Sequence, residues 1–366
     1  MAGILFLVPR MNIGGAETYV YTAAKALHER GWEVCVASGG GQLADSLVKL
    51  GIPTYFLPIR LSRPLSAFFL ERIVKKHHIR LIHANSGAAG IVAEKVKSRT
   101  GIPVVYTAHG IFGNPEREYV IDRLDRIVCV SQYVKDDAIR RGFSENHMVV
   151  RYSGIDTKRF TADEGLRQAV RSELGIPEGV LTLAIVSRIK NLYHKGHGHL
   201  LSMFATYGKN ENWRLLVIGK GRGLSLLKKR IQSLGLSERV YCLGHHTDVE
   251  RYVNGADVMV LPSRFETFGL VLAEGMAMGK PAIAFATGGT PEVIDDGYTG
   301  FLVEQGNERE LYEKINCLDK DRVLLKQMSG EGIRQVRERF SLEKMIDDLE
   351  NIYADFDCHR KIKRQA

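Results

Sequence analysis

Short apolar runs alternate with longer amphipathic segments along the chain, and the alternation occurs in two successive blocks. Short apolar runs bounded by turn residues predict strands that are buried on both faces of a parallel sheet. The predicted strands are 4–8, 33–37, 81–84, 104–107 and 127–130 in the first block and 181–186, 215–218, 240–243, 258–261, 282–285 and 301–303 in the second. Helical segments separate them. The pattern therefore predicts an α/β protein made of two Rossmann-like domains.

The length of the chain agrees with two domains, because 366 residues are many for one hydrophobic core. A polar stretch at 160–178 separates the two blocks. We predict an N-terminal domain over 1–165 and a second domain over 166–340. A helical tail at 341–366 is expected to pack back on the first domain. Ligands of such sheets bind beyond the carboxyl ends of the strands, so a cleft between the halves is the expected site.

The segment 261–292, LPSRFETFGLVLAEGMAMGKPAIAFATGGTPE, places two carboxylates around the start of a helix. Glu266 lies in the loop after a predicted strand, and Glu274 lies in the following helix. Backbone N–H groups at a helix start lack partners and attract anions, and Gly269 would let a ligand approach. A diphosphate could therefore dock at Phe268, Gly269 and Leu270. Spacing alone equally allows a packed helix with two solvated carboxylates.

Further motifs follow the second carboxylate. They are Gly279-Lys280-Pro281, then Gly288-Gly289, then Glu292. With Glu266 and Glu274, this order resembles the retaining, nucleotide-sugar-dependent glycosyltransferases of family 4, also called group 1. The resemblance covers nearly the whole chain and implies the GT-B fold, with the two sheets facing across a cleft.

The resemblance also implies an activity. We expect a retaining, metal-independent hexosyltransferase that moves a sugar from a nucleoside diphosphate sugar, favoured as a UDP-sugar, to an acceptor. Glu274 would hold the ribose hydroxyls and Glu266 the transferred sugar. Retention by front-face attack is implied by the family only. The spacing of the residues does not predict the stereochemistry.

Two predicted strand ends of the first block carry further candidates. Gly14 and Gly15 follow the first strand, where a glycine pair lets the backbone approach a phosphate or an acceptor. A plain tight turn is the alternative. His109 follows the strand at 104–107, and the resemblance points to it as a contact to the donor sugar. The alternative is a structural histidine whose hydrogen bonds are all made within the fold.

Two cations follow the first strand of the second block. Arg188 and Lys195 could clamp a diphosphate and stabilise the charge of the leaving group. Their spacing is longer than the family usually shows, so Lys190 remains an alternative to Lys195. With these cations supplying positive charge, we expect no metal and no cofactor besides the nucleotide-sugar co-substrate. The histidines of 194–199 are expected to be structural or solvated.

The charge of the chain is concentrated in its first part. Residues 1–160 hold 22 Lys and Arg against 14 Asp and Glu, whereas the remainder holds 29 against 28. The densest basic stretch, Ile59 to Arg80, interleaves cations with leucine and phenylalanine. Such a segment can lie on an anionic membrane surface. It can equally be a core-facing helix with solvated charges. Nothing resembles a nucleic-acid-binding motif, so no nucleic acid partner is expected.

Compartment and acceptor follow from these observations. No apolar run reaches the roughly 18 residues of a membrane span, and five scattered cysteines favour reduced thiols. We expect a cytoplasmic protein that could contact the inner face of the membrane. The basic first part favours a lipid-linked or polysaccharide acceptor in cell-envelope glycan synthesis. A soluble small-molecule acceptor, a nucleotide-sugar epimerase of the same fold and a non-catalytic binding protein remain alternatives.

Overall fold

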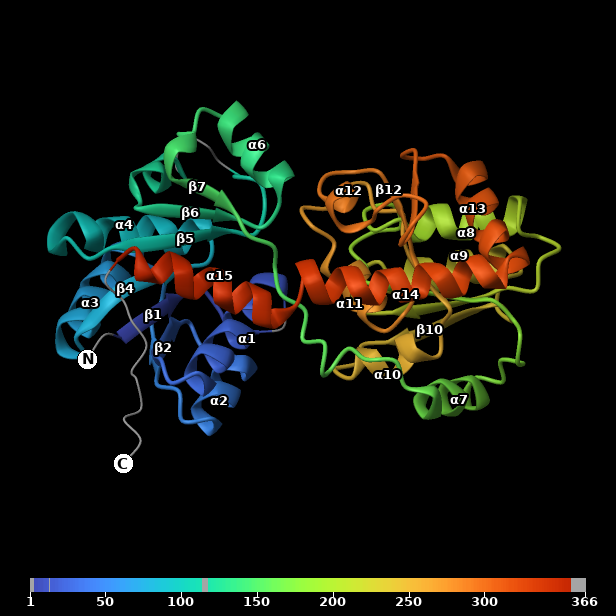
Figure 1. Cartoon of the computed structure of the whole chain (residues 1–366), viewed down its shortest axis with the longest axis horizontal. Coiled ribbons are helices and arrows are strands. Elements are labelled where there is room, and N and C mark those ends of the chain that lie inside the picture. The colour runs from blue at the N-terminus through green and yellow to red at the C-terminus, as the bar shows by residue number, and fades with distance from the viewer. Residues whose placement is uncertain (1–2, 13, 114–117, 357–366) are drawn as a thin grey trace. The chain divides into compact units, whose positions relative to one another are not determined.

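The chain forms two compact units, and a computed structural model describes residues 3–12, 14–113 and 118–356 of it (Figure 1). Unit 1 contains the chain up to Gly154 and again from Leu342 onward, and unit 2 contains Ile155–Ser341. The units divide at Gly154 and Ile155 instead of near residue 165. The reason is that Ile155 N donates to Phe340 O at 2.7 Å, which ties the segment before residue 165 to the last helix of unit 2.

Unit 1 is built on a seven-stranded parallel sheet in the order β3-β2-β1-β4-β5-β6-β7. Its strands are β1 Gly3–Leu7, β2 Glu33–Ser38, β3 Thr54–Phe56, β4 Ile79–Ala84, β5 Val104–Ala108, β6 Arg126–Cys129 and β7 Met148–Val150. The five strands predicted in this block are confirmed. The two edge strands β3 and β7 were not predicted, because three residues are too short to give a recognisable pattern.

The helices of unit 1 come from both parts of the chain. They are α1 Gly15–Glu29, α2 Gln42–Lys49, α3 Arg63–Lys76, α4 Gly87–Thr100, α6 Gln132–Arg140 and α15 Leu342–Ala354, with 3-10 turns η1 Tyr119–Arg123 and η2 Glu145–His147. Helix α15, red in Figure 1, packs beside α1. Its residues Met345, Ile346, Leu349 and Tyr353 join the core formed with β1, β2 and α1.

Polar contacts also attach α15 to unit 1. Arg30, at the end of α1, pairs with Asp347 at 2.6 Å and with Glu350 at 2.8 Å. Trp32 Nε1 donates to Glu350 at 2.7 Å. Within the predicted tail, Leu342–Ala354 is therefore a helix of unit 1. Residues 357–366 of the predicted tail lie outside the described part of the chain.

Unit 2 is built on a six-stranded parallel sheet in the order β10-β9-β8-β11-β12-β13. Its strands are β8 Thr182–Val186, β9 Arg214–Ile218, β10 Val240–Gly244, β11 Val258–Leu261, β12 Ala282–Phe285 and β13 Gly300–Val303. Its helices are α7 Glu164–Glu173, α8 His197–Thr206, α9 Leu224–Ser233, α10 Val249–Asn254, α11 Leu270–Ala277, α12 Thr290–Val293, α13 Glu308–Lys320 and α14 Arg322–Arg339. All six strands predicted for this block are confirmed.

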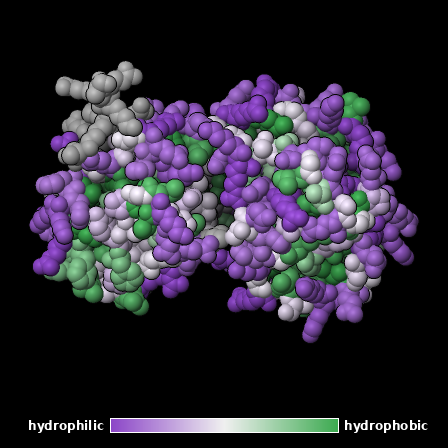
Figure 2. Space-filling model, turned by 90° about the horizontal axis from the view of Figure 1, so that it is seen from below, coloured by the Kyte–Doolittle hydropathy of each residue, from purple (hydrophilic) through white to green (hydrophobic). Residues whose placement is uncertain are grey.

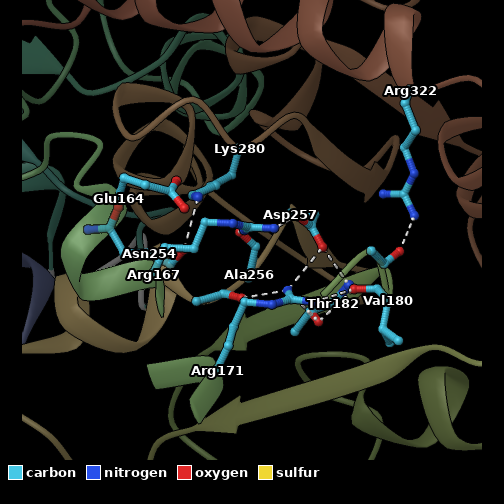
Figure 3. Close-up of polar contacts among 12 residues, drawn as sticks. Glu164, Arg167, Arg171, Val180, Thr182, Asn254, Ala256, Asp257, Lys280 and Arg322 are labelled. Carbon is cyan, nitrogen blue, oxygen red and sulfur yellow. Dashed lines mark hydrogen bonds and ion pairs between the residues drawn. The ribbon is translucent and has the colours of Figure 1, made fainter. Parts of the chain in front are cut away.

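A buried charge cluster fixes the amino ends of the unit 2 strands (Figure 3). Arg171 of α7 donates to the carbonyl oxygens of Pro177 and Val180, at 2.7 and 2.8 Å. Asp257, just before β11, accepts from Arg167 at 2.7 Å and from the backbone of Thr182 at 2.8 Å. These charged groups bond to other groups of unit 2. They lie at the amino ends of the strands, opposite to the carboxyl ends.

Candidate functional site

At the carboxyl ends of β11 and β12, two loops pack backbone against backbone. Gly288 has φ +60, and a Cβ at this position would overlap the carbonyl oxygen of Glu266. Gly289 N donates to the same oxygen at 3.0 Å. Only glycine allows so close an approach. The Gly288-Gly289 pair therefore holds the Glu266 loop in place.

Glu266 is nearly buried and is paired on one oxygen. Its Oε1 accepts from Ser263 Oγ at 2.8 Å and forms an ion pair with Lys195 Nζ. Lys195 reaches this position because Gly196, at φ +84, packs on the carbonyl of Pro262, where a Cβ would overlap. Two residues predicted for the site, distant in sequence, are thus in direct contact.

Arg188 and Lys190 lie in the same loop as Lys195 and are exposed. Ile189 N, between them, donates to Lys220 O at 3.1 Å, and Gly223 N donates to Ile189 O at 3.0 Å. The glycines of 219–223 therefore serve close packing of two strand-end turns. The ion pair with Glu266 comes from Lys195, and Lys190 takes no part in it.

Helix α11 begins at Leu270, and its N-cap residue is a glycine. Gly269 has the left-handed conformation, with φ +97, and has no side chain with which to cap the first backbone N–H groups of the helix. Phe268 is buried, and its ring packs edge-on against Phe340 at 5.4 Å between centroids. The helix start therefore keeps the positive end of its dipole available for an anion.

Glu274 is half-buried, one turn into α11. Burial raises its pKa to about 7, while the nearby Arg159 lowers it and Glu250 raises it. Arg159 is held by Glu250, at 2.8 Å, and by the carbonyl of Thr247, at 2.6 Å. Arg159 was missed by the sequence analysis, because it lies about a hundred residues earlier and in no motif. Burial therefore keeps the pKa of Glu274 raised despite the nearby Arg159 cation.

In unit 1, His109 follows β5 and contacts residues of two other elements. Its Nε2 lies 3.0 Å from Asn85 Oδ1, and its ring meets Tyr19 edge-on at 4.7 Å between centroids. Burial lowers the pKa of His109 to about 3, so the imidazole is neutral. Asn85, fully buried after β4, was also missed, although a polar residue directly after a predicted strand could have indicated it.

Gly14 and Gly15 lie at the start of α1. Gly14 is the N-cap residue and its backbone is extended, so its φ does not require glycine. A Cβ on Gly14 would instead overlap the carboxylate of Glu17. The glycine thus makes room for this acidic side chain in the first turn of α1.

A buried polar chain links α15 to the strands of unit 1. His83 of β4 is fully buried, with Nδ1 at 2.6 Å from Tyr353 Oη and Nε2 at 2.7 Å from Thr107 Oγ1. Thr107 in turn bonds Tyr19, whose pKa burial raises to about 12. Burial lowers the pKa of His83 to about 3, so this chain carries no charge at neutral pH. Sequence alone could not pair residues 270 positions apart.

The three histidines of 194–199 do not converge on one point. His197 Nε2 lies 3.3 Å from Ser187 Oγ, and His199 Nδ1 lies 2.9 Å from Glu308. Burial lowers the pKa of His197 to about 4. Within the described ranges, no three His, Cys, Asp or Glu side chains are grouped as a metal site would require.

The two parallel sheets and their strand-end loops define a Rossmann-like pair of the GT-B class. Two family models match the chain. "Glycosyltransferase Family 4" matches residues 13–159, and "Glycosyl transferases group 1" matches residues 167–335. The chain belongs to this glycosyltransferase family and is an enzyme of that kind, as the motifs of the second block predicted.

Known relatives and solved structures agree with this assignment. N-acetyl-alpha-D-glucosaminyl L-malate synthase of Bacillus anthracis is 26% identical over 94% of each chain. The Anabaena protein Alr3699/HepE, solved with UDP and glucose, is 24% identical and superimposes with a TM-score of 0.84 over 96% of this chain and 99% of that one. A glycosyltransferase of Rickettsia africae superimposes with a TM-score of 0.86 at 24% identity, over 100% and 99%. These structures confirm the GT-B fold.

Proposed function

We propose that this glycosyltransferase uses a UDP-sugar and transfers the sugar with retention of its anomeric configuration. The observation that carries the proposal is the ion pair of Lys195 with Glu266, which lies four residues before the start of α11 at Leu270, where the N-cap residue is Gly269. One short segment holds a helix start and two carboxylates, and the loop after β8 brings a cation to the first of them. This combination suits a sugar attached to a diphosphate. The Anabaena structure with UDP and glucose supports this choice of donor.

Each candidate site residue of unit 2 has a role in this proposal. The diphosphate docks on the backbone of Phe268, Gly269 and Leu270, and Glu274 accepts hydrogen bonds from the ribose. Glu266 accepts from hydroxyls of the transferred sugar. Arg188 and Lys195 stabilise the negative charge of the departing diphosphate, a role that preorganised cations fill well. No metal and no further cofactor is part of the proposal.

The transfer itself needs no covalent enzyme intermediate. The bond from the anomeric carbon to the diphosphate oxygen breaks, and the acceptor hydroxyl oxygen bonds the same face of that carbon. The acceptor proton passes to the leaving diphosphate oxygen. In unit 1, the neutral His109 contacts the donor sugar, and the Gly14-Gly15 turn contacts the phosphate or the acceptor.

The donor test is calorimetric titration with UDP-sugars and GDP-sugars. We expect UDP-sugar binding that weakens about tenfold or more in Glu274→Gln, because a charge-assisted hydrogen bond is lost. Glu266→Gln should mainly lower turnover. Glu238→Gln, an exposed change before β10, is the control and should bind as the wild type does. Unchanged binding in Glu274→Gln would remove its assignment.

For the acceptor we propose a lipid-linked or polysaccharide intermediate of cell-envelope glycan synthesis, used on the cytoplasmic side of the membrane. The basic excess in residues 1–160 supports it. A soluble acceptor is the second candidate, because the relative in Bacillus anthracis is named for malate. Incubating a radiolabelled UDP-sugar with membrane lipids or with small hydroxy acids separates the two. Isomerisation without any acceptor would instead support an epimerase.

A further inference from the structure

Helix α3 has two opposite faces of different character. At about 100° per residue, Ala67, Leu70 and Val74 share the face that packs on unit 1. Leu65, Phe69, Arg72 and Lys76 share the opposite face. Leu65 and Phe69 are 45% and 40% exposed. The alternative of a core-facing helix with solvated charges explains the first face only, because leucine and phenylalanine are not side chains of a solvated face.

An open groove of about 560 Å³ runs along this outward face. Its apolar walls come from α3 and from the end of β3, and they are Tyr55, Phe56, Pro58, Leu65, Phe69 and Ile73. The same groove is lined by Arg72, Lys76 and His77. Figure 2 shows hydrophobic side chains at the surface at the left end of the view, the end at which α3 lies in Figure 1.

The groove holds two cations, Arg72 and Lys76. In the described part of the chain, no carboxylate forms an ion pair with Arg72 or Lys76. Glu71, the single acid of Ile59–Arg80, pairs with Lys75 at 2.8 Å and with Arg99 at 3.6 Å. Arg72 lies over the ring of Phe68, at 4.5 Å from its centroid. Apolar and cationic side chains are therefore interleaved and both face outward.

We propose that the outward face of α3 and its groove dock on an anionic phospholipid bilayer. Phe56, Leu65 and Phe69 enter the boundary between head groups and acyl chains, and the groove takes part of an acyl chain. Arg72 and Lys76 pair with lipid phosphates, as cations flanking an apolar interfacial helix do. This inference rests on the proposed function, because docking on the bilayer would bring the enzyme to its proposed lipid-linked acceptor.

A basic, apolar surface could also take an acidic peptide, but the bilayer is favoured. Outside the groove, Leu61, between the groove residue Pro58 and the start of α3, is a further apolar side chain and is 87% exposed. A second hollow, next to the C-terminal end of α3, is lined by Lys75, Arg80 and Arg99, of which Lys75 and Arg99 pair with Glu71. Cations spread around an apolar centre match a charged plane better than one bound strand or helix.

Vesicle co-sedimentation of the full chain tests the inference. The vesicles are phosphatidylcholine alone, or phosphatidylcholine with phosphatidylglycerol, at low and at high salt. The wild type should bind the anionic vesicles at low salt and bind neutral vesicles at least tenfold more weakly. The double change Arg72→Glu and Lys76→Glu should reduce anionic vesicle binding at least tenfold. Phe56→Ser with Phe69→Ser should reduce it at both salt concentrations.

A matched control reverses two exposed charges elsewhere, Lys228→Glu with Lys229→Glu on α9, and should bind vesicles as the wild type does. Thermal unfolding of each variant shows that it is folded. Absence of wild-type binding to anionic vesicles, or binding unchanged in both groove variants, would overturn the proposal.

The same variants are titrated with a UDP-sugar in solution. Unchanged UDP-sugar affinity together with lost vesicle binding supports the membrane inference. Vesicle binding without any nucleotide-sugar binding would leave the membrane inference standing and contradict the proposed activity.

Discussion

The carboxyl edges of the two sheets are both polar, but they differ in charge. The edge of unit 2 carries an ion pair, exposed cations and a carboxylate whose pKa burial raises to about 7. The edge of unit 1 carries His83 and His109, whose pKa burial lowers to about 3, together with Asn85 and Thr107. Unit 2 is therefore suited to hold an anion, and unit 1 offers neutral hydrogen-bonding groups that keep the same form across physiological pH.

The largest expected effect comes from removing the cation of the ion pair in unit 2. Lys195→Met should lower turnover about a hundredfold or more, because the leaving diphosphate loses a preorganised charge. It also leaves Glu266 nearly buried without its partner, which should lower the free energy of unfolding by roughly 3 kcal/mol. Steady-state kinetics and urea unfolding measure the two effects.

The double variant Lys195→Met with Glu266→Gln separates structure from chemistry. Removing both charges should recover much of the lost unfolding free energy, since no unpaired carboxylate remains. Turnover should stay low. Recovery of turnover along with stability would show that the pair serves the fold alone.

A smaller effect is expected from the neutral network of unit 1. Tyr353→Phe removes the hydroxyl at His83 Nδ1 and should lower the free energy of unfolding of unit 1 by about 1–3 kcal/mol. Urea unfolding followed by hydrogen exchange reports each unit separately. Tyr298→Phe, which changes a tyrosine 72% exposed in unit 2, is the control. Equal stability of Tyr353→Phe and wild type would mean that the buried contact adds nothing to unit 1.

The smallest expected effect is the pH dependence of donor binding. Hydrogen bonds from the ribose favour the charged form of Glu274, so its raised pKa must fall on binding and UDP-sugar affinity must rise with pH. With a pKa of about 7, the affinity should increase by at most about tenfold from pH 6 to pH 8.

Calorimetric titration of a UDP-sugar over this range measures the slope. Glu274→Gln should remove it, since the amide does not titrate. Because the pKa values of His83 and His109 lie near 3, these two histidines should contribute nothing to the slope. A slope that persists in Glu274→Gln would place the titrating group elsewhere.

The sequence could predict the features that repeat locally and not those that join distant segments. Strands with continuous apolar runs were found, whereas β3 and β7 were too short to recognise. The helix start at Gly269 followed from its glycine and the apolar residues after it. Spacing left Lys190 and Lys195 as alternative contacts to the diphosphate. It did not reveal that Lys195 pairs with Glu266, because this contact depends on how Gly196 packs on Pro262. Arg159 and Tyr353 contribute through contacts that only the folded chain makes.

The return of α15 to unit 1 has a consequence for biosynthesis. Unit 2 is continuous in sequence, so all of its strands have been synthesised before α15 is made. The first 154 residues, although translated earliest, still lack the Tyr353 hydroxyl for His83 and the carboxylates for Arg30 and Trp32. Unit 1 is thus begun first and completed last. Until α15 has been synthesised, the apolar surface of unit 1 that α15 covers stays exposed.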